Sequence, residues 1–149
     1  MRRLAALTAV FGLVASPARA QCLIDGVTGP AFGTYDVFSA SALDTMGSVT
    51  YKCLVSLAVT IDLSTGSSGT YAARTLARIG GGSTLSYNLY ADVARQSVWG
   101  DGTNGTVHYV IILALLTDVT IPIYGRIPAR QGTAATGNYS DVVVITLNY

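Results

Sequence analysis

Short runs in which apolar and polar residues alternate are the feature that most constrains the fold of this chain. The clearest lie at residues 47–53, 58–64, 85–90 and 119–125. Because successive side chains of a β-strand point to opposite faces, each run predicts a strand with one buried face and one wet face. The residues expected to face the core are Val49, Tyr51, Cys53, Val59, Ile61, Leu63, Leu85, Tyr87 and Leu89. Pro122 has no N–H to donate, which predicts an edge strand or a bulge in the last run.

The composition favours the same class of fold. All eight acidic residues are aspartates and Lys52 is the single lysine, so strong helix formers are scarce. Val, Ile, Thr and Tyr, which favour strands, are plentiful. About six or seven short strands, separated by turns rich in Gly, Ser and Thr, predict an all-β, immunoglobulin-like β-sandwich. The length suits one domain.

Residues 1–20 have the pattern of a secretory signal peptide rather than of a buried core helix. Arg2 and Arg3 precede an apolar stretch, residues 4–15, that is too short to span a bilayer, and a small-x-small cleavage site follows. We therefore expect a mature domain of residues 21–149. Cleavage leaves six basic residues against eight aspartates, so no basic patch remains to hold nucleic acid.

The two cysteines, Cys22 and Cys53, both lie in the part of the chain that is expected to be exported. An exported chain meets an oxidising compartment, where such a pair forms a disulfide. The loop that it closes has about thirty residues, for which the chain-entropy model gives roughly 3–4 kcal/mol of stabilisation. The alternative is two free buried thiols.

The last stretch, residues 137–149, predicts one further strand, bounded by a Gly-Asn turn signal. One face of this strand carries Val143, Ile145, Leu147 and Tyr149. The other face carries Val142, Val144, Thr146 and Asn148. A fully apolar row of this kind needs a cover, which is either the protein's own sheet or another chain.

Several motifs, in this order along the chain, resemble the spore coat U domain family, which includes the subunits of archaic chaperone–usher pili. They are residues 31–35, 85–90, 99–102, 124–128 and 137–149, with Cys22 and Cys53 flanking the first. Each motif alone is an ordinary turn or strand, but the set in this order and spacing is fairly specific. The resemblance covers nearly all of the expected mature chain.

The resemblance implies an incomplete immunoglobulin-like fold that lacks its last strand. A periplasmic chaperone would lend a strand to the open groove, and at the outer-membrane usher the neighbouring pilus subunit would replace it. The row Val143, Ile145, Leu147 and Tyr149 would then be one wall of that groove, which binds by β-augmentation. The expected product is a fibre on the cell surface, reached by export through the periplasm.

Gln21 is the one residue between the expected cleavage site and Cys22, whereas a useful donor strand needs around ten residues. We therefore expect an acceptor without a donor, placed at the fibre tip and involved in adhesion or biofilm formation.

No catalytic or cofactor-binding constellation stands out in the sequence. His108 is the single histidine, so neither a metal site nor a Ser-His-Asp triad is expected, and the serines of residues 66–69 lack a nucleophile elbow. Trp99 is expected to anchor a loop or the core rather than to bind a ligand. The chain is thus expected to be no enzyme and to have no cofactor and no small-molecule substrate.

Two alternatives to the pilus subunit stay open. The first is a self-sufficient β-sandwich that binds a surface through its loops. The second is a spore or cell coat protein that assembles by the same pairing of strand edges without an usher.

Overall fold

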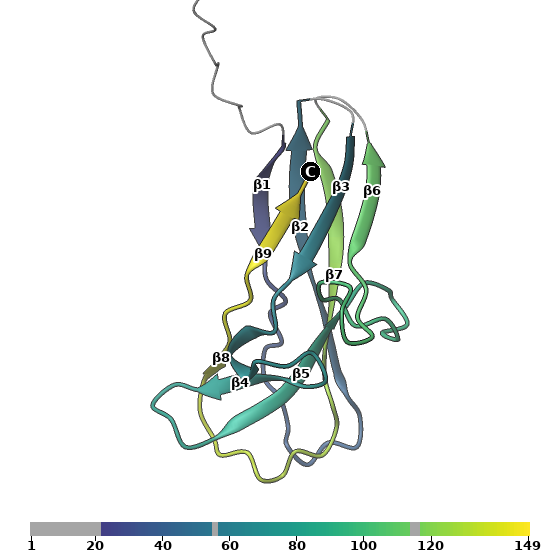
Figure 1. The fold of residues 1–149 in the computed structure, drawn as a ribbon. Helices are drawn as coiled ribbons and strands as arrows, with labels where there is room; N and C mark the ends of the chain where they lie inside the picture. The colour runs from purple at the N-terminus through teal and green to yellow at the C-terminus, as the bar shows by residue number, and fades with distance from the viewer. Residues whose placement is uncertain (1–21, 55–56, 114–116) are drawn as a thin grey trace, which may run out of the picture.

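Two antiparallel β-sheets make up the described part of the chain, residues 22–54, 57–113 and 117–149, in a computed structural model (Figure 1). The larger sheet has the order β1 (Cys22–Thr28), β2 (Leu43–Cys53), β7 (Val119–Ile127), β5 (Thr84–Tyr90), β4 (Arg74–Arg78) and β8 (Tyr139–Ser140). The smaller sheet has the order β6 (Tyr109–Leu113), β3 (Leu57–Leu63) and β9 (Ile145–Asn148). This arrangement confirms the all-β sandwich. The expected signal peptide and Gln21 lie outside the described residues.

The core lies between the two sheets and contains the residues that alternation predicted. Every inward-facing residue named from the sequence is buried, with at most 5% of its surface exposed. Trp99 is fully buried, and its indole N–H donates a hydrogen bond of 2.8 Å to the carbonyl of Ile61 on β3. The prediction that Trp99 anchors the core is therefore confirmed. Within the described ranges, no helix is long and apolar enough to cross a membrane.

Two expectations about strands need correction. Strand β7 is an inner strand of the larger sheet and not an edge, although it contains Pro122. Its ladder with β5 covers just residues 124–126, so at Pro122 the ladder partner is β2 alone and the missing N–H breaks no pairing with β5. The terminal stretch is not one strand, because residues 141–144 separate β8 from β9.

The chain that leaves β1 crosses the inner face of the larger sheet very closely. A Cβ atom at Gly47 on β2 would overlap the carbonyl oxygen of Thr28 and lie 2.7 Å from the nitrogen of Pro30. A Cβ at Gly125 on β7 would lie 2.9 Å from the ring of Phe32. Both positions require glycine because the crossing segment occupies the space of a side chain. This crossing places residues 30–36 over the sheet, outside any strand.

Candidate functional site

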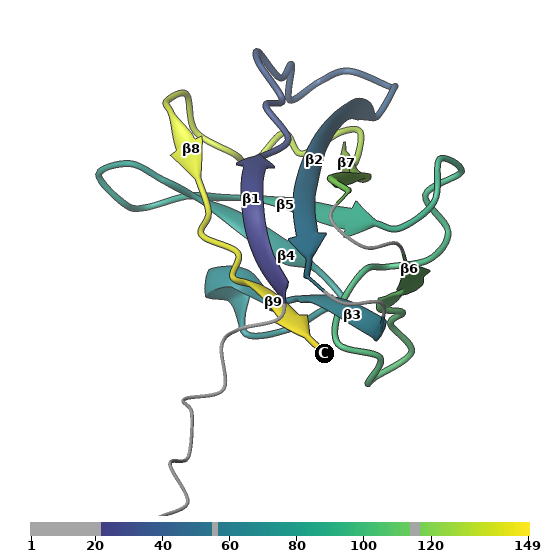
Figure 2. The same cartoon turned by 90° about the horizontal axis from the view of Figure 1, so that it is seen from above.

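The two strands at the margin of the sandwich leave its side open. Strand β1 is an edge of the larger sheet, and β9 is an edge of the smaller sheet. They lie side by side, as Figure 2 and Figure 1 both show, yet in the described part of the chain they share no β-ladder. An edge strand presents unpaired N–H and C=O groups, so this side of the molecule can accept a further strand.

A cavity of about 330 Å³ lies at this open side. It is lined by Val27, Gly29, Pro30, Phe32, Leu63, Leu76, Tyr87, Leu89, Ile123, Asp141, Val142, Val143 and Ile145. Its walls are the end of β1 with the crossing segment on one side and residues 141–145 on the other, and its floor comes from β3, β4, β5 and β7. Nearly all the lining residues are apolar, so the cavity suits apolar side chains of an incoming segment.

The structure brings together part of the row that the sequence predicted. Val143, Ile145 and Leu147 are half-buried and pack against the core, while Val144, Thr146 and Asn148 are exposed. Val143 and Ile145 line the cavity. Tyr149 lies beyond the end of β9 and is 54% exposed, so it stands apart from the other three.

Sequence reasoning named the floor residues Leu63, Tyr87 and Leu89 as core residues, but it did not place them in a groove. Phe32 belongs to residues 31–35, which sequence reasoning named as a family motif without placing them in a groove. The ring of Phe32 packs edge-on against Tyr87 at a centroid distance of 6.0 Å. No sequence signal pointed to Leu76, because the segment around it lacks clear alternation.

Asp141 fixes the wall that bears Val143. Its Oδ1 accepts hydrogen bonds from the Ser67 N–H at 2.9 Å and the Ser67 hydroxyl at 2.6 Å, and Oδ2 accepts one from the Tyr87 hydroxyl at 2.7 Å. Burial pushes the pKa of the Asp141 carboxyl upward, but the hydrogen bonds together outweigh burial and hold this pKa below its ordinary value. Burial also raises the pKa of the Tyr87 hydroxyl, which therefore stays a donor.

Arg74 is a fully buried cation beneath the same region. Its guanidinium donates to the carbonyl oxygens of Ser64 and Trp99 and to the side-chain oxygen of Asn88, at 2.7–3.0 Å. Desolvation lowers the pKa of Arg74, but an arginine remains charged in proteins. The guanidinium fork thus joins β4 and β5 to the residue that follows β3, and Tyr71 covers it in a cation–π contact of 5.2 Å.

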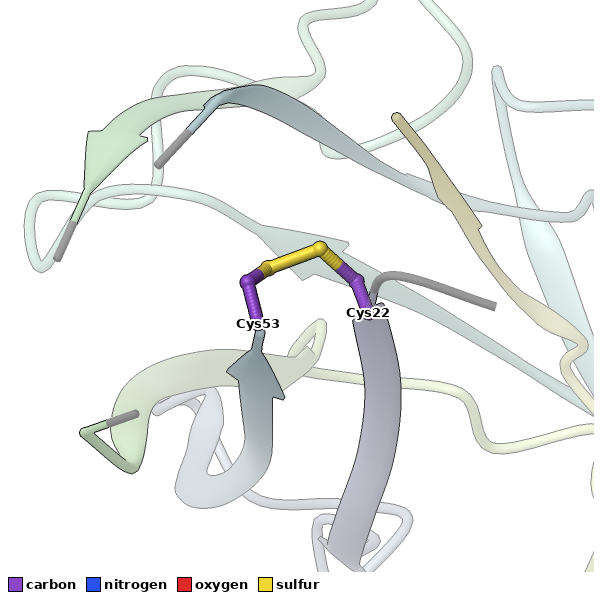
Figure 3. Close-up of a disulfide and its surroundings, with 2 residues drawn as sticks. All are labelled: Cys22 and Cys53. Atoms are coloured by element: carbon purple, nitrogen blue, oxygen red, sulfur yellow. A yellow bond between two sulfur atoms is a disulfide. The ribbon is translucent and has the colours of Figure 1, made fainter. Parts of the chain in front are cut away.

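Cys22 and Cys53 form a disulfide, as predicted, at the start of β1 and the end of β2 (Figure 3). The two residues face each other in the β1–β2 ladder and are nearly buried. The bond therefore fastens the strand that forms one margin of the groove.

The other residues singled out in the sequence have structural partners. His108 lies 3.5 Å from Asp62, measured between Nδ1 and Oδ1, and the Ser67 hydroxyl donates to Asp141. In the ranges that the structure covers, no three His, Cys, Asp or Glu side chains gather as metal ligands would.

Fold and site together define an all-β sandwich with an open apolar groove between two strand edges. The chain belongs to the Spore Coat Protein U domain family, whose model matches residues 8–146. It is 34% identical over 175 residues to Protein U of Myxococcus xanthus, an alignment that covers 97% of this chain and 96% of that protein. The recognised resemblance to this family is therefore confirmed.

A solved structure has a similar fold. It is the CsuC–CsuE chaperone–tip adhesion subunit pre-assembly complex from the archaic chaperone–usher Csu pili of Acinetobacter baumannii, with a TM-score of 0.62. The sequence identity is 17%, and the match covers 86% of this chain and 39% of the other. The chain thus spans about two fifths of that longer chain, and at this identity the likeness concerns the fold alone.

Proposed function

We propose that this protein is a structural subunit of a chaperone–usher surface fibre and accepts a donor strand in its open groove. The observation that carries the proposal is the apolar cavity between β1 and residues 141–145, at two strand edges that lack ladder partners within the described residues. A periplasmic chaperone would supply the first strand, and a neighbouring subunit, at an outer-membrane usher, the second. The role is mechanical and involves no catalytic turnover.

The energetics of the cavity support a strand as the occupant. A donor that buries four or five apolar side chains gains roughly 1.5–3 kcal/mol from each of them. The sum approaches the whole stability of a small domain, about 5–15 kcal/mol. A subunit with an empty groove is therefore expected to be unstable and prone to associate through its edges.

The test is expression of the full chain in a bacterial periplasm, alone and together with its cognate chaperone. We expect aggregation or degradation of the chain alone and recovery of a 1:1 complex with the chaperone. A stable monomer without the chaperone would contradict the proposal and favour the self-sufficient surface-binding module. Cleavage of residues 1–20 is read from the mass of the recovered chain.

We further propose a place at the fibre tip, where the protein would accept a strand and serve adhesion. This finer proposal is tested by adding the usher to the purified complex. If the usher incorporates a single copy of this subunit, the result fits a tip position. Long homopolymers of the subunit would exclude a tip position.

One observation favours a second candidate, a coat protein. The family carries the name of a spore coat protein, and the alignment with the Myxococcus relative covers nearly all of both chains. A coat protein would pair the same edges with copies of itself. Chaperone and usher genes beside the gene for this chain would favour the fibre, and their absence would favour the coat.

A further inference from the structure

A second cavity, of about 690 Å³, continues from the first. The residues that line both cavities are Pro30, Phe32, Leu76 and Asp141. The walls of the second cavity are residues 30–38 on one side and residues 134–141 on the other. The two cavities therefore form one groove that extends beyond β9, past the end of the smaller sheet.

Both walls of the second cavity consist of backbone that lacks a partner across the gap. Residues 30–36 follow β1, the first strand of the larger sheet, and belong to no ladder in the described ranges. Strand β8 is the last strand of the same sheet and pairs with β4 on its other side. Residues 30–36 and β8 thus lie on opposite sides of one gap. A backbone inserted there can hydrogen-bond to both segments.

The side chains along the groove change in character from one cavity to the next. The first cavity is apolar except for Asp141 and the hydroxyl of Tyr87. The polar residues of the second cavity are Thr34, Tyr35, Asp36, Thr136, Asn138, Tyr139, Ser140 and Asp141. Two of them, Asp36 and Asp141, are acidic, and none of the described residues that line this cavity is basic. A cationic side chain is therefore the charge that fits there.

We infer that the groove takes a donor segment of about twelve residues, which lies opposite residues 137–148 and has two chemically distinct halves. The half beside β9 carries apolar side chains at alternate positions. The half beside β8 and residues 30–36 is polar and carries lysine or arginine. This inference rests on the proposed function and adds the length and chemistry of the strand that the partner must supply.

The experiment uses the full chain with a donor fused after Tyr149 through a tight turn, so that the added segment runs antiparallel to β9 and toward β8. A short donor has about six residues with valine at alternate positions, and a long donor adds six residues of alternating threonine and lysine. Thermal unfolding and amide hydrogen exchange are compared among the unfused chain, the short fusion and the long fusion. A long donor with prolines at alternate positions of its second half is the matched control.

We expect the long donor to raise Tm by about 5 °C or more above the short donor. We also expect it to slow amide exchange in residues 30–36 and β8 about tenfold or more, and the proline control to lose both effects. A short donor that fails to stabilise the chain would overturn the proposed function itself. A short donor that stabilises while the long donor adds neither effect would overturn this inference alone.

The charge preference has its own readout. Replacing the donor lysines by glutamates is expected to lower the Tm of the long fusion, and Asp36→Asn is expected to shrink the difference between the two donors. The Asn side chain can still accept the hydrogen bond that the Phe38 N–H gives to Asp36 at 2.9 Å, so the turn is preserved. Equal Tm values for lysine and glutamate donors would show that the acidic lining does not select the donor. A fusion that runs as a dimer would show that a second copy fills the gap.

Discussion

Asp141 is the residue that holds the outer wall of the groove in place. It lies where the chain leaves β8, and its carboxylate binds a serine on η1 (Gly66–Ser68) and a tyrosine on β5. It also accepts a hydrogen bond of 2.9 Å from the Val142 N–H, which holds the chain at the point where the strand is interrupted. One side chain thus ties two separate parts of the sandwich, η1 and β5, to the segment that carries Val143.

We predict that Asp141→Asn lowers the free energy of unfolding by about 1–3 kcal/mol at pH 7, since it removes charged hydrogen bonds. The folded pKa of Asp141 is depressed, so its stabilisation is complete above the unfolded pKa of about 4 and is lost as the pH falls through the folded pKa. The deficit of the variant should therefore shrink toward pH 3. Denaturant titrations of the short-donor fusion at pH 7, 4 and 3 measure it.

Ser67→Ala, which removes one donor of this carboxylate, should show a smaller deficit in the same pH window. A deficit of Asp141→Asn that is as large at pH 3 as at pH 7 would contradict the role of the charge. The pKa of Asp44 is also depressed, through its hydrogen bonds with Arg126. Its pH-dependent contribution to the free energy of unfolding is the same in both variants and therefore cancels in the comparison.

At the level of residues, alternation predicted the core but not its polar contacts. Residues such as Val59 and Tyr87 reveal their orientation through neighbours two positions away, because the period of a strand is local. Arg74 and Asp141 have no such signal. Their burial depends on carbonyl and hydroxyl groups supplied by distant segments, and a single sequence does not show which segments meet.

At the level of elements, the sequence predicted most strands and missed the breaks between them. The run of residues 137–149 has strand composition throughout, yet residues 141–144 leave the ladder because Asp141 turns toward Ser67 and Tyr87. Residues 31–35 also have strand composition, but they lie outside any strand, and Phe32 packs over Gly125 on the inner face of the sheet. In both cases a tertiary contact overrides local propensity.

The interrupted segment allows a matched test of the groove wall. Val143 lines the cavity, whereas Val144 points away from it and is 58% exposed. We predict that Val143→Thr speeds the exchange of labelled chaperone out of the purified complex about tenfold, because a hydroxyl of equal size must be buried among apolar groups. The identical substitution Val144→Thr should leave the exchange rate unchanged. Equal effects of both substitutions would contradict the assignment of the wall.

At the level of the whole molecule, the groove depends on β1 staying attached to its sheet. This strand is an edge, its ladder with β2 is irregular between Ile24 and Gly26, and most of its residues are exposed. Such a strand has few contacts to hold it, and it nevertheless forms one margin of the groove that we propose accepts a donor strand. The disulfide at its first residue compensates for this weakness by joining β1 to the end of β2.

We therefore predict that the double substitution Cys22→Ala and Cys53→Ala in the short-donor fusion lowers the free energy of unfolding by about 3–4 kcal/mol, the value for a closed loop of this size. Alanine avoids burying a hydroxyl at two nearly buried positions. Amide exchange should speed up first in β1, because the loss begins at the free margin. Reduction of the disulfide in the unsubstituted fusion should have the same effects as the double substitution. A loss below about 1 kcal/mol, or faster exchange spread evenly over both sheets, would show that the β1–β2 ladder alone holds the margin of the groove.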